Sequence, residues 1–148
     1  YPDWVLTIVG EGEYRTLIEE LIMEKNLFNQ VKLIGAVNDE NYWYKNSAFF
    51  AFPSLGEGFP NALVEAFSNG LPALGLNTTS GVNELIVNNK NGLLALHKEK
   101  NYALAMKKMI DNISFRKNSG RIASYSIKKY KPELIYDKWE ELFLKLSN

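Results

Sequence analysis

The sequence predicts an α/β protein with a Rossmann-like parallel sheet of about five strands, helices on both faces, and further helices at the C-terminal end. From Trp4 to His97, short apolar runs typical of strands alternate with amphipathic stretches typical of helices. Beyond Glu99 the apolar residues recur only at helical spacing. Strands that alternate with helices pair in parallel, because the chain must cross back over the sheet before each new strand.

The predicted elements follow one another along the chain with turn residues between them. Strands are predicted at residues 4–9, 31–34, 48–52, 71–76 and 93–96, and helices at residues 13–25, 39–46, 60–69 and 82–87. The helices after Glu99 carry apolar stripes that we expect to be core contacts. These stripes comprise Tyr102, Ala105, Met106 and Met109, then Ile122, Tyr125 and Ile127, and finally Tyr136, Trp139, Leu142, Phe143 and Leu146.

Composition excludes several classes of function. The 148 residues suit one domain, and the formal net charge of zero argues against a nucleic-acid partner. Charge is nevertheless uneven, with 4 basic and 10 acidic residues at 1–74 against 13 and 7 at 75–148. We interpret the basic half as solvated helix faces, with an anionic membrane or partner surface as the alternative. The absence of cysteine excludes disulfides, thiolate catalysis and thiolate metal sites.

The stretch from Phe49 to Asn69 is the strongest candidate for a functional site. An apolar run typical of a buried strand ends at Pro53, and a loop containing Ser54, Gly56 and Gly58 follows. Pro60 suits the first position of a helix, which we expect to end at Gly70. The free N–H groups of a helix start favour an anion such as a phosphate.

Glu57 and Glu65 flank this helix start with seven residues between them. The spacing alone carries no information, because Glu11 with Glu19 and Glu133 with Glu141 have the same separation. The 57/65 pair differs in context, since its first member follows a buried strand and its second lies in the helix. Four-residue spacing puts Asn61 and Glu65 on one face of that helix, and Leu63 and Phe67 on another.

These residues resemble a known family. The run Glu57-Gly-Phe-Pro-Asn-Ala-Leu-Val-Glu65-Ala-Phe, followed by Asn69-Gly-Leu-Pro72, is similar to the donor-site motif of retaining glycosyltransferases of family 4, which have the GT-B fold. Ser80-Gly81-Val82-Asn83-Glu84-Leu85-Ile86 and Asn91-Gly92-Leu93-Leu94 also resemble the nucleotide-binding domain of that family, in the same order. The resemblance extends from Val5 to the last predicted helix.

The resemblance implies a role for each residue of the motif. Glu65 would bind the ribose hydroxyls of a nucleotide sugar, UDP- or GDP-linked, and Glu57 would hold the donor sugar and stabilise positive charge in the transition state. Backbone groups around Gly58, Phe59, Pro60, Asn61 and Ala62 would meet hexose and diphosphate oxygens. Gly35, Ala36 and Val37 would border the base, and Glu84 would orient a neighbouring loop rather than touch the ligand. Neither a cofactor nor a metal is expected, because enzymes of this kind do not need a bound metal and the sequence offers no Asp-x-Asp triplet.

The resemblance also implies how the protein is organised. We expect residues 1–148 to be a single donor-binding domain, truncated at its N-terminus, without the N-terminal acceptor domain and inactive alone. An Arg and a Lys that neutralise the diphosphate in the family would precede Tyr1. The expected acceptor is a glycan or a lipid-linked sugar. The expected location is the cytoplasm, with peripheral contact at the inner face of the membrane as an option.

Three alternatives compete with this resemblance. The Gly10-Glu11-Gly12 sequence after a strand is typical of a dinucleotide site, but Arg15 occupies the place of the third glycine. Another GT-B enzyme, such as a nucleotide-sugar epimerase or a phosphorylase-like transferase, would share the scaffold. A non-catalytic α/β binding module of response-regulator type would need acidic residues clustered at the strand ends, and Asp3 and Asp39 are not so placed.

Overall fold

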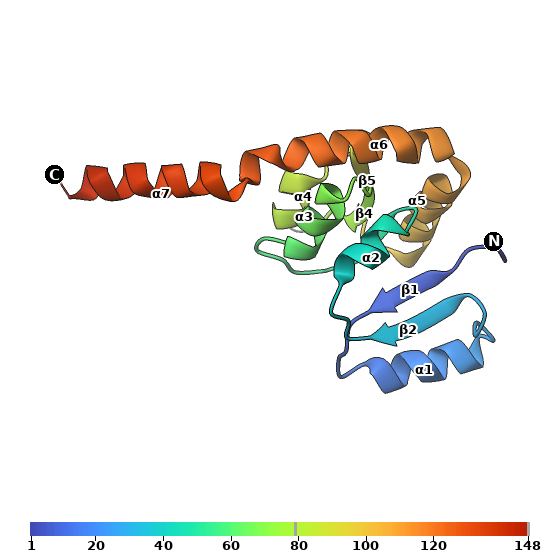
Figure 1. The fold of residues 1–148 in the computed structure, drawn as a ribbon. Coiled ribbons are helices and arrows are strands. Elements are labelled where there is room, and N and C mark those ends of the chain that lie inside the picture. The colour runs from blue at the N-terminus through green and yellow to red at the C-terminus, as the bar shows by residue number, and fades with distance from the viewer. Residues whose placement is uncertain (79, 148) are drawn as a thin grey trace. The chain divides into compact units, whose positions relative to one another are not determined.

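The structure is a computed structural model that describes residues 1–78 and 80–147 (Figure 1). It divides into two compact units, Tyr1–Glu40 and a larger one that begins at Asn41. Each unit has its own parallel sheet.

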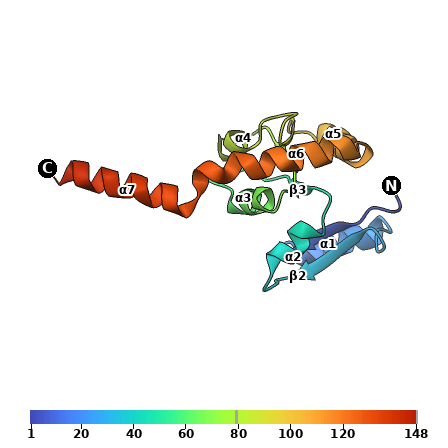
Figure 2. The same ribbon diagram turned by 45° about the horizontal axis from the view of Figure 1, so that its top comes forward.

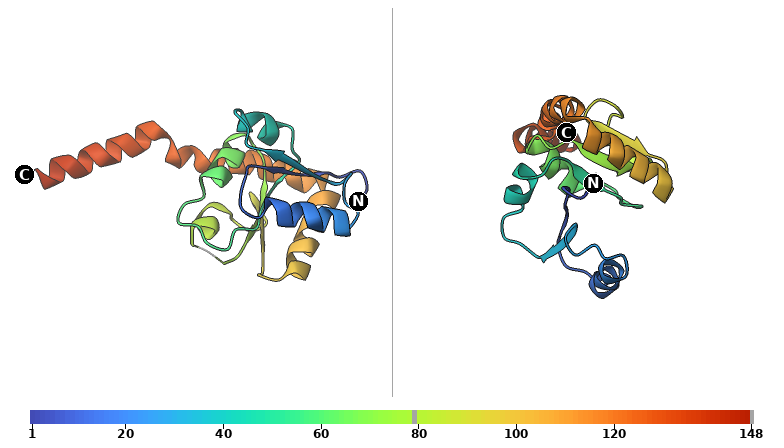
Figure 3. Two further views of the ribbon diagram at one scale, coloured as in Figure 1. Left: turned by 90° about the horizontal axis from the view of Figure 1, so that it is seen from below. Right: turned by 90° about the vertical axis from the view of Figure 1, so that its right-hand side faces the viewer.

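The first unit is a single β–α–β crossover. Its elements are β1 (Leu6–Val9), α1 (Arg15–Glu24) and β2 (Val31–Gly35). The two strands pair in parallel with Leu6 opposite Val31, and the register shifts at the carboxyl end so that Val9 lies opposite Gly35. Helix α1 lies beside the strand pair in every view (Figures 1 and 3).

The second unit contains the remaining strands in the order β3-β4-β5, all parallel. Ala73 of β4 lies between Phe50 of β3 and Gly92 of β5. The elements up to the last strand are α2 (Glu40–Lys45), β3 (Phe50–Phe52), α3 (Asn61–Ser68), β4 (Ala73–Leu76), α4 (Ser80–Leu85) and β5 (Gly92–Ala95).

Helices cover both faces of this sheet, because alternate residues of its central strand point to opposite sides. Ala73 of β4 packs with Leu63 and Phe67 of α3, together with residues of α4 and α6 (Ile113–Ser126). Leu74 packs on the other side with Met109 of α5 (Glu99–Asp111). Figure 2 shows α6 running alongside α3 and α4. The predicted arrangement of parallel strands with helices on both faces is confirmed.

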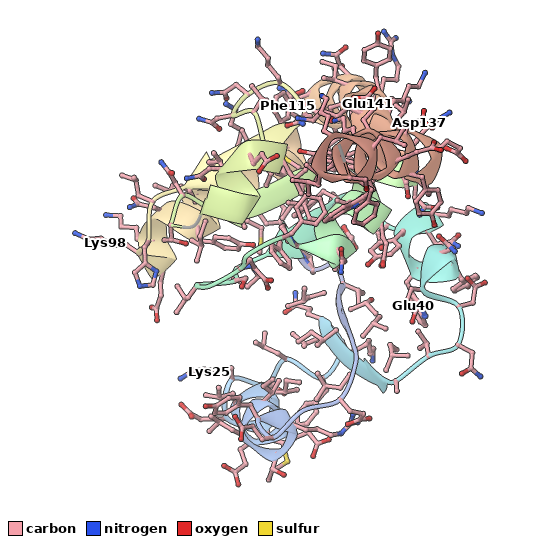
Figure 4. The ribbon with its side chains drawn as sticks, turned by 90° about the vertical axis from the view of Figure 1, so that its left-hand side faces the viewer. Lys25, Glu40, Lys98, Phe115, Asp137 and Glu141 are labelled. Atoms are coloured by element: carbon pink, nitrogen blue, oxygen red, sulfur yellow. The ribbon has the colours of Figure 1, made fainter. Side chains whose placement is uncertain are left out.

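The strands pair within each unit, β1 with β2 in the first, and β3 with β4 and β4 with β5 in the second. One sequence prediction about packing is wrong. Tyr125 and the apolar stripe of α7 (Pro132–Leu146) are exposed rather than in the core, for example Tyr136 at 70%. Helix α7 follows the short 3₁₀ helix η1 (Ile127–Tyr130) and extends away from the β3–β5 sheet (Figure 1). Its side chains, including Asp137 and Glu141, spread around its axis in Figure 4.

Candidate functional site

A loop of residues 53–60 connects β3 to α3 and contains most of the predicted site residues. It ends at Pro60, whose φ of −82° and ψ of 90° are extended, so α3 begins at Asn61. Pro60 is therefore the N-cap of α3. The sequence prediction that Pro60 is the first helical residue is wrong by one position. The Pro60 carbonyl accepts the first helical hydrogen bonds, from the N–H groups of Leu63 at 3.0 Å and Val64 at 3.3 Å.

Helix α3 presents two different faces, as its sequence predicts. Leu63 and Phe67 are fully buried, whereas Asn61 and Glu65 are exposed. Helix α3 ends at Ser68, with Asn69 as its C-cap. Gly70 follows with a φ of +73°, a conformation that favours glycine, and its N–H donates to the Phe67 carbonyl at 2.9 Å. The buried face fixes α3 on the sheet and leaves the Glu65 side chain available to a ligand.

Glu57 is half-buried in the loop and is held by a neighbour within it. The Ser54 hydroxyl donates to Glu57 Oε1 at 3.0 Å. A carboxylate accepts more than one hydrogen bond, so this contact orients Glu57 without using all of its lone pairs.

Glu65 is held by a different element. The Tyr44 hydroxyl of α2 donates to Glu65 Oε2 at 3.1 Å. The Tyr44 ring also packs edge-on against Phe50 of β3, with centroids 5.7 Å apart and planes at 84°. Tyr44 therefore packs against β3 through its ring and orients Glu65 through its hydroxyl. The two glutamates thus have independent hydrogen-bond donors.

No protein atom fills the space where Gly56 and Gly58 of the loop would carry a side chain. A Cβ atom built on Gly56 or Gly58 would meet nothing within 4 Å, and neither residue has a left-handed φ. Packing and backbone conformation therefore do not require glycine at either position. The space beside this backbone is open to a ligand.

Two other elements, α4 and η1, contact the loop. A Cβ atom on Gly81 of α4 would lie 2.3 Å from the Gly58 carbonyl oxygen, so the two backbones are in close contact. The Phe59 ring meets the Tyr130 ring of η1 with centroids 5.3 Å apart and planes at 66°. The Tyr130 hydroxyl donates to Glu84 Oε1 of α4 at 2.6 Å.

Gly35, Ala36 and Val37 belong to the first unit, whereas the loop of residues 53–60 belongs to the second. Gly35 ends β2 with a φ of +84°, and a Cβ there would lie 2.7 Å from Glu11 Oε1. Ala36 is exposed and Val37 half-buried. Arg15 forms surface ion pairs with Glu11 and with Glu19, each at 2.9 Å. The proximity of the Glu11 carboxylate raises the pKa of Arg15.

Within residues 1–78 and 80–147, no three His, Asp or Glu side chains converge as a metal site. Over the same described part of the chain, none of the helices has both the length and the hydropathy that crossing a membrane requires.

Sequence reasoning missed three residues that position this site: Ser54, Tyr44 and Tyr130. The sequence predicts only a flexible loop at Ser54, whereas its hydroxyl binds Glu57, three residues later. Tyr44 and Tyr130 lie 21 and 46 residues from Glu65 and Glu84, so no local pattern could reveal them.

Comparison with known proteins decides the family. The sequence profile described as "Glycosyl transferases group 1" matches residues 1–126. This chain belongs to the group 1 glycosyltransferases. Its fold is that of the C-terminal domain of GT-B glycosyltransferases, and membership in this family argues against a response-regulator-type module or a dinucleotide-binding protein.

Individual group 1 relatives are similar over much of the chain. An uncharacterized glycosyltransferase of Haemophilus influenzae is 36% identical over 94 residues, which is 64% of this chain and 27% of that protein. An N-acetylgalactosamine-N,N'-diacetylbacillosaminyl-diphospho-undecaprenol 4-alpha-N-acetylgalactosaminyltransferase of Campylobacter jejuni is 33% identical over 116 residues, 78% of this chain and 32% of that protein. The crystal structure of Anabaena HepE in complex with UDP superposes with a TM-score of 0.88 at 21% identity, covering 98% of this chain and 42% of that one. The chain therefore spans about a third or less of the two curated relatives.

Proposed function

We propose that this chain is the donor-binding part of a larger hexosyltransferase of family 4, which transfers a hexosyl group from a nucleotide-diphosphate sugar to an acceptor with retention of anomeric configuration. Membership in the group 1 family and the short span of the chain within its relatives support this proposal. In the whole protein, a preceding segment would supply the acceptor domain and the Arg and Lys that neutralise the diphosphate. Residues 1–148 alone would then be inactive.

The observation that carries the proposal is the open backbone of the Glu57–Gly58 loop beside the start of α3. The N–H groups of Gly58, Phe59, Asn61 and Ala62 would meet hexose and diphosphate oxygens, whereas Pro60 has no N–H and turns the chain into the helix. The partial positive charge of the helix start favours the charge that develops on the leaving diphosphate. Glycine at position 58 lets the donor approach the backbone without meeting a side chain.

The two glutamates would act on different parts of the donor. Glu65 would accept hydrogen bonds from the ribose hydroxyls, with Tyr44 fixing its orientation through Oε2. Glu57 would hold the hydroxyls of the sugar ring while the bond between the anomeric carbon and the phosphate oxygen breaks. Its negative charge would stabilise the oxocarbenium-like transition state, and Ser54 would keep it in place. Gly35, Ala36 and Val37 would border the base.

The basic surface of the second unit supports the proposal of an acceptor at a membrane. Residues 112–132 contain six basic and no acidic side chains, and Lys117, Arg121 and Lys128 among them are exposed. Such a surface attracts anionic lipid, by about 1 kcal/mol per cation. The name of the Campylobacter relative includes a sugar linked to diphospho-undecaprenol. We therefore propose a lipid-linked sugar or glycan acceptor and peripheral contact with the inner face of the cytoplasmic membrane.

Ligand-observed NMR with UDP-, GDP- and ADP-sugars tests donor binding. We expect saturation transfer from the whole protein to ribose and base protons, and its loss in Glu65→Ala. The matched control is Glu141→Ala, because Glu141 is exposed on α7 and stands eight positions after Glu133, as Glu65 does after Glu57. Binding that survives Glu65→Ala, or no transfer to any nucleotide sugar, would contradict the proposal. Measurable sugar transfer by residues 1–148 alone would contradict the proposed need for a second domain.

A further inference from the structure

Three segments that are distant in the sequence meet at Gly58 and Phe59. The first is the loop that carries Glu57, the second is α4, and the third is η1. Phe59 is 43% exposed, and the Tyr130 ring of η1 covers one side of it. Tyr130 is itself half-buried and packs against the core cluster shared by α3, α4 and α6. Tyr130 therefore connects a loop without regular structure to the rigid part of the second unit.

We propose that Tyr130 is a positioning residue that holds the Glu57–Phe59 loop in place through its ring on Phe59 and its hydroxyl on Glu84. This inference rests on the proposed function, since the loop matters only if it binds the donor sugar. Tyr130 would act through Phe59 and not through direct contact with the donor.

Helix α4 takes part in both contacts that hold the loop, directly through Gly81 and through Tyr130 by way of Glu84. Gly81 lies against the Gly58 carbonyl, and Glu84, three residues later on the same side of the helix, accepts the Tyr130 hydroxyl. The loop is thus held between one backbone contact at Gly58 and one ring contact at Phe59. A shift of Tyr130 would release the ring contact while leaving Glu65 and Tyr44 untouched, because these lie on α3 and α2.

The charges around Tyr130 suit a hydroxyl that stays protonated. Burial raises the pKa of Tyr130, and Glu84 raises it further through its hydrogen bond, while Lys129 opposes this shift. Lys129 Nζ lies 4.7 Å from the centroid of the Tyr130 ring, where a cation interacts favourably with the ring face. At neutral pH the phenol therefore donates to Glu84, and the connection between η1 and α4 persists.

The test compares saturation transfer to the hexose protons with saturation transfer to the ribose protons of one donor molecule bound to the whole protein. Tyr130→Phe keeps the ring and removes only the hydroxyl. The probe is whichever of UDP-glucose, UDP-N-acetylglucosamine and GDP-mannose gives the strongest saturation transfer to the wild-type protein. We expect Tyr130→Phe to lower saturation transfer to the hexose protons at least twofold relative to the ribose protons, with nucleotide diphosphate affinity unchanged. Since a displacement of about 1 Å in a catalytic site costs up to about 100-fold, we expect kcat to fall about tenfold.

Tyr125→Phe is the matched control, because Tyr125 precedes η1, is 73% exposed and also has a lysine, Lys128, 4.9 Å from its ring centroid. Glu84→Gln keeps an acceptor oxygen for the phenol, so we expect it to retain most of the hexose signal that Glu84→Ala loses. A general loss of folded protein would lower the hexose and ribose signals together and leave their ratio unchanged, which would overturn the proposal. So would a Tyr130→Phe protein that behaves like Tyr125→Phe. If the wild-type protein gives no signal with any of the three donors, that result contradicts the proposed function itself, on which the role of Tyr130 rests.

Discussion

A methyl group at Gly81 should separate the effects of loop position from those of stability. In Gly81→Ala, the new Cβ would lie 2.3 Å from the Gly58 carbonyl oxygen and 3.0 Å from that of Glu57, whereas ordinary contacts are 3.4–4 Å. The loop must therefore move by about 1 Å, because Val82 and Leu85 anchor α4 in the core. Overpacking of this kind costs about 1–3 kcal/mol of unfolding free energy. A displacement of that size at the reacting sugar should lower kcat/KM by about 100-fold.

The matched control is Gly92→Ala at the opposite end of the sheet. Its Cβ would lie 2.2 Å from the Ala73 carbonyl oxygen, so the two substitutions create equally severe backbone contacts. Gly92 and Ala73 are the first residues of β5 and β4, whereas the Glu57 loop follows the carboxyl end of β3. We expect similar losses of stability in urea denaturation for both variants, but a large loss of transfer activity only for Gly81→Ala.

Two results would refute this reasoning. If both variants lose activity in the same proportion as they lose folded protein, the loop has no special dependence on α4. If Gly81→Ala is destabilised by the expected amount but keeps its kcat/KM, the position of the Glu57–Gly58 backbone does not limit the reaction.

Substitutions at Gly58, Asn91 and Tyr102 test other features of the structure. Gly58→Ala should leave the unfolding free energy unchanged or raise it by about 0.4–1 kcal/mol, since its Cβ meets no protein atom, yet weaken donor binding measured by calorimetry. Asn91→Ala should lower the unfolding free energy by about 1–3 kcal/mol in urea denaturation, because the buried Asn91 amide donates to the Leu85 carbonyl at 2.8 Å and its oxygen accepts from the Val87 N–H at 2.8 Å. Burial raises the pKa of Tyr102 above its ordinary value of 10.0, so the native protein keeps this proton after the unfolded chain has lost it. Below about pH 10 this group should not affect the unfolding free energy, and above it the unfolding free energy should fall by up to about 1.4 kcal/mol per pH unit. Tyr102→Phe should lack this decrease when unfolding is measured at about pH 8 and at about pH 11.

The sequence by itself determined the elements and the local chemistry of the site. Alternating apolar and amphipathic stretches established parallel strands separated by helices, since each pattern reflects contacts within a few residues. The two faces of α3 and its end before Gly70 were predictable for the same reason, because Leu63, Phe67 and Glu65 share one helix. The family resemblance rested on the residues from Glu57 to Pro72 and on two shorter runs that follow, and the profile match confirmed its coarser part, membership in the group 1 glycosyltransferases.

Only the tertiary structure decided which distant residues hold that site and which apolar stripes are buried. Tyr44 reaches Glu65 and Tyr130 reaches Glu84 across long stretches of chain, and such pairings depend on how helices pack rather than on local periodicity. The stripe of α7 shows the same limit, since spacing predicts an apolar face but not what lies against it, and Trp139 and Phe143 stack on each other while remaining exposed. Local patterns fix the direction in which a side chain points along its own element, whereas its partner depends on how the chain places a second element opposite it.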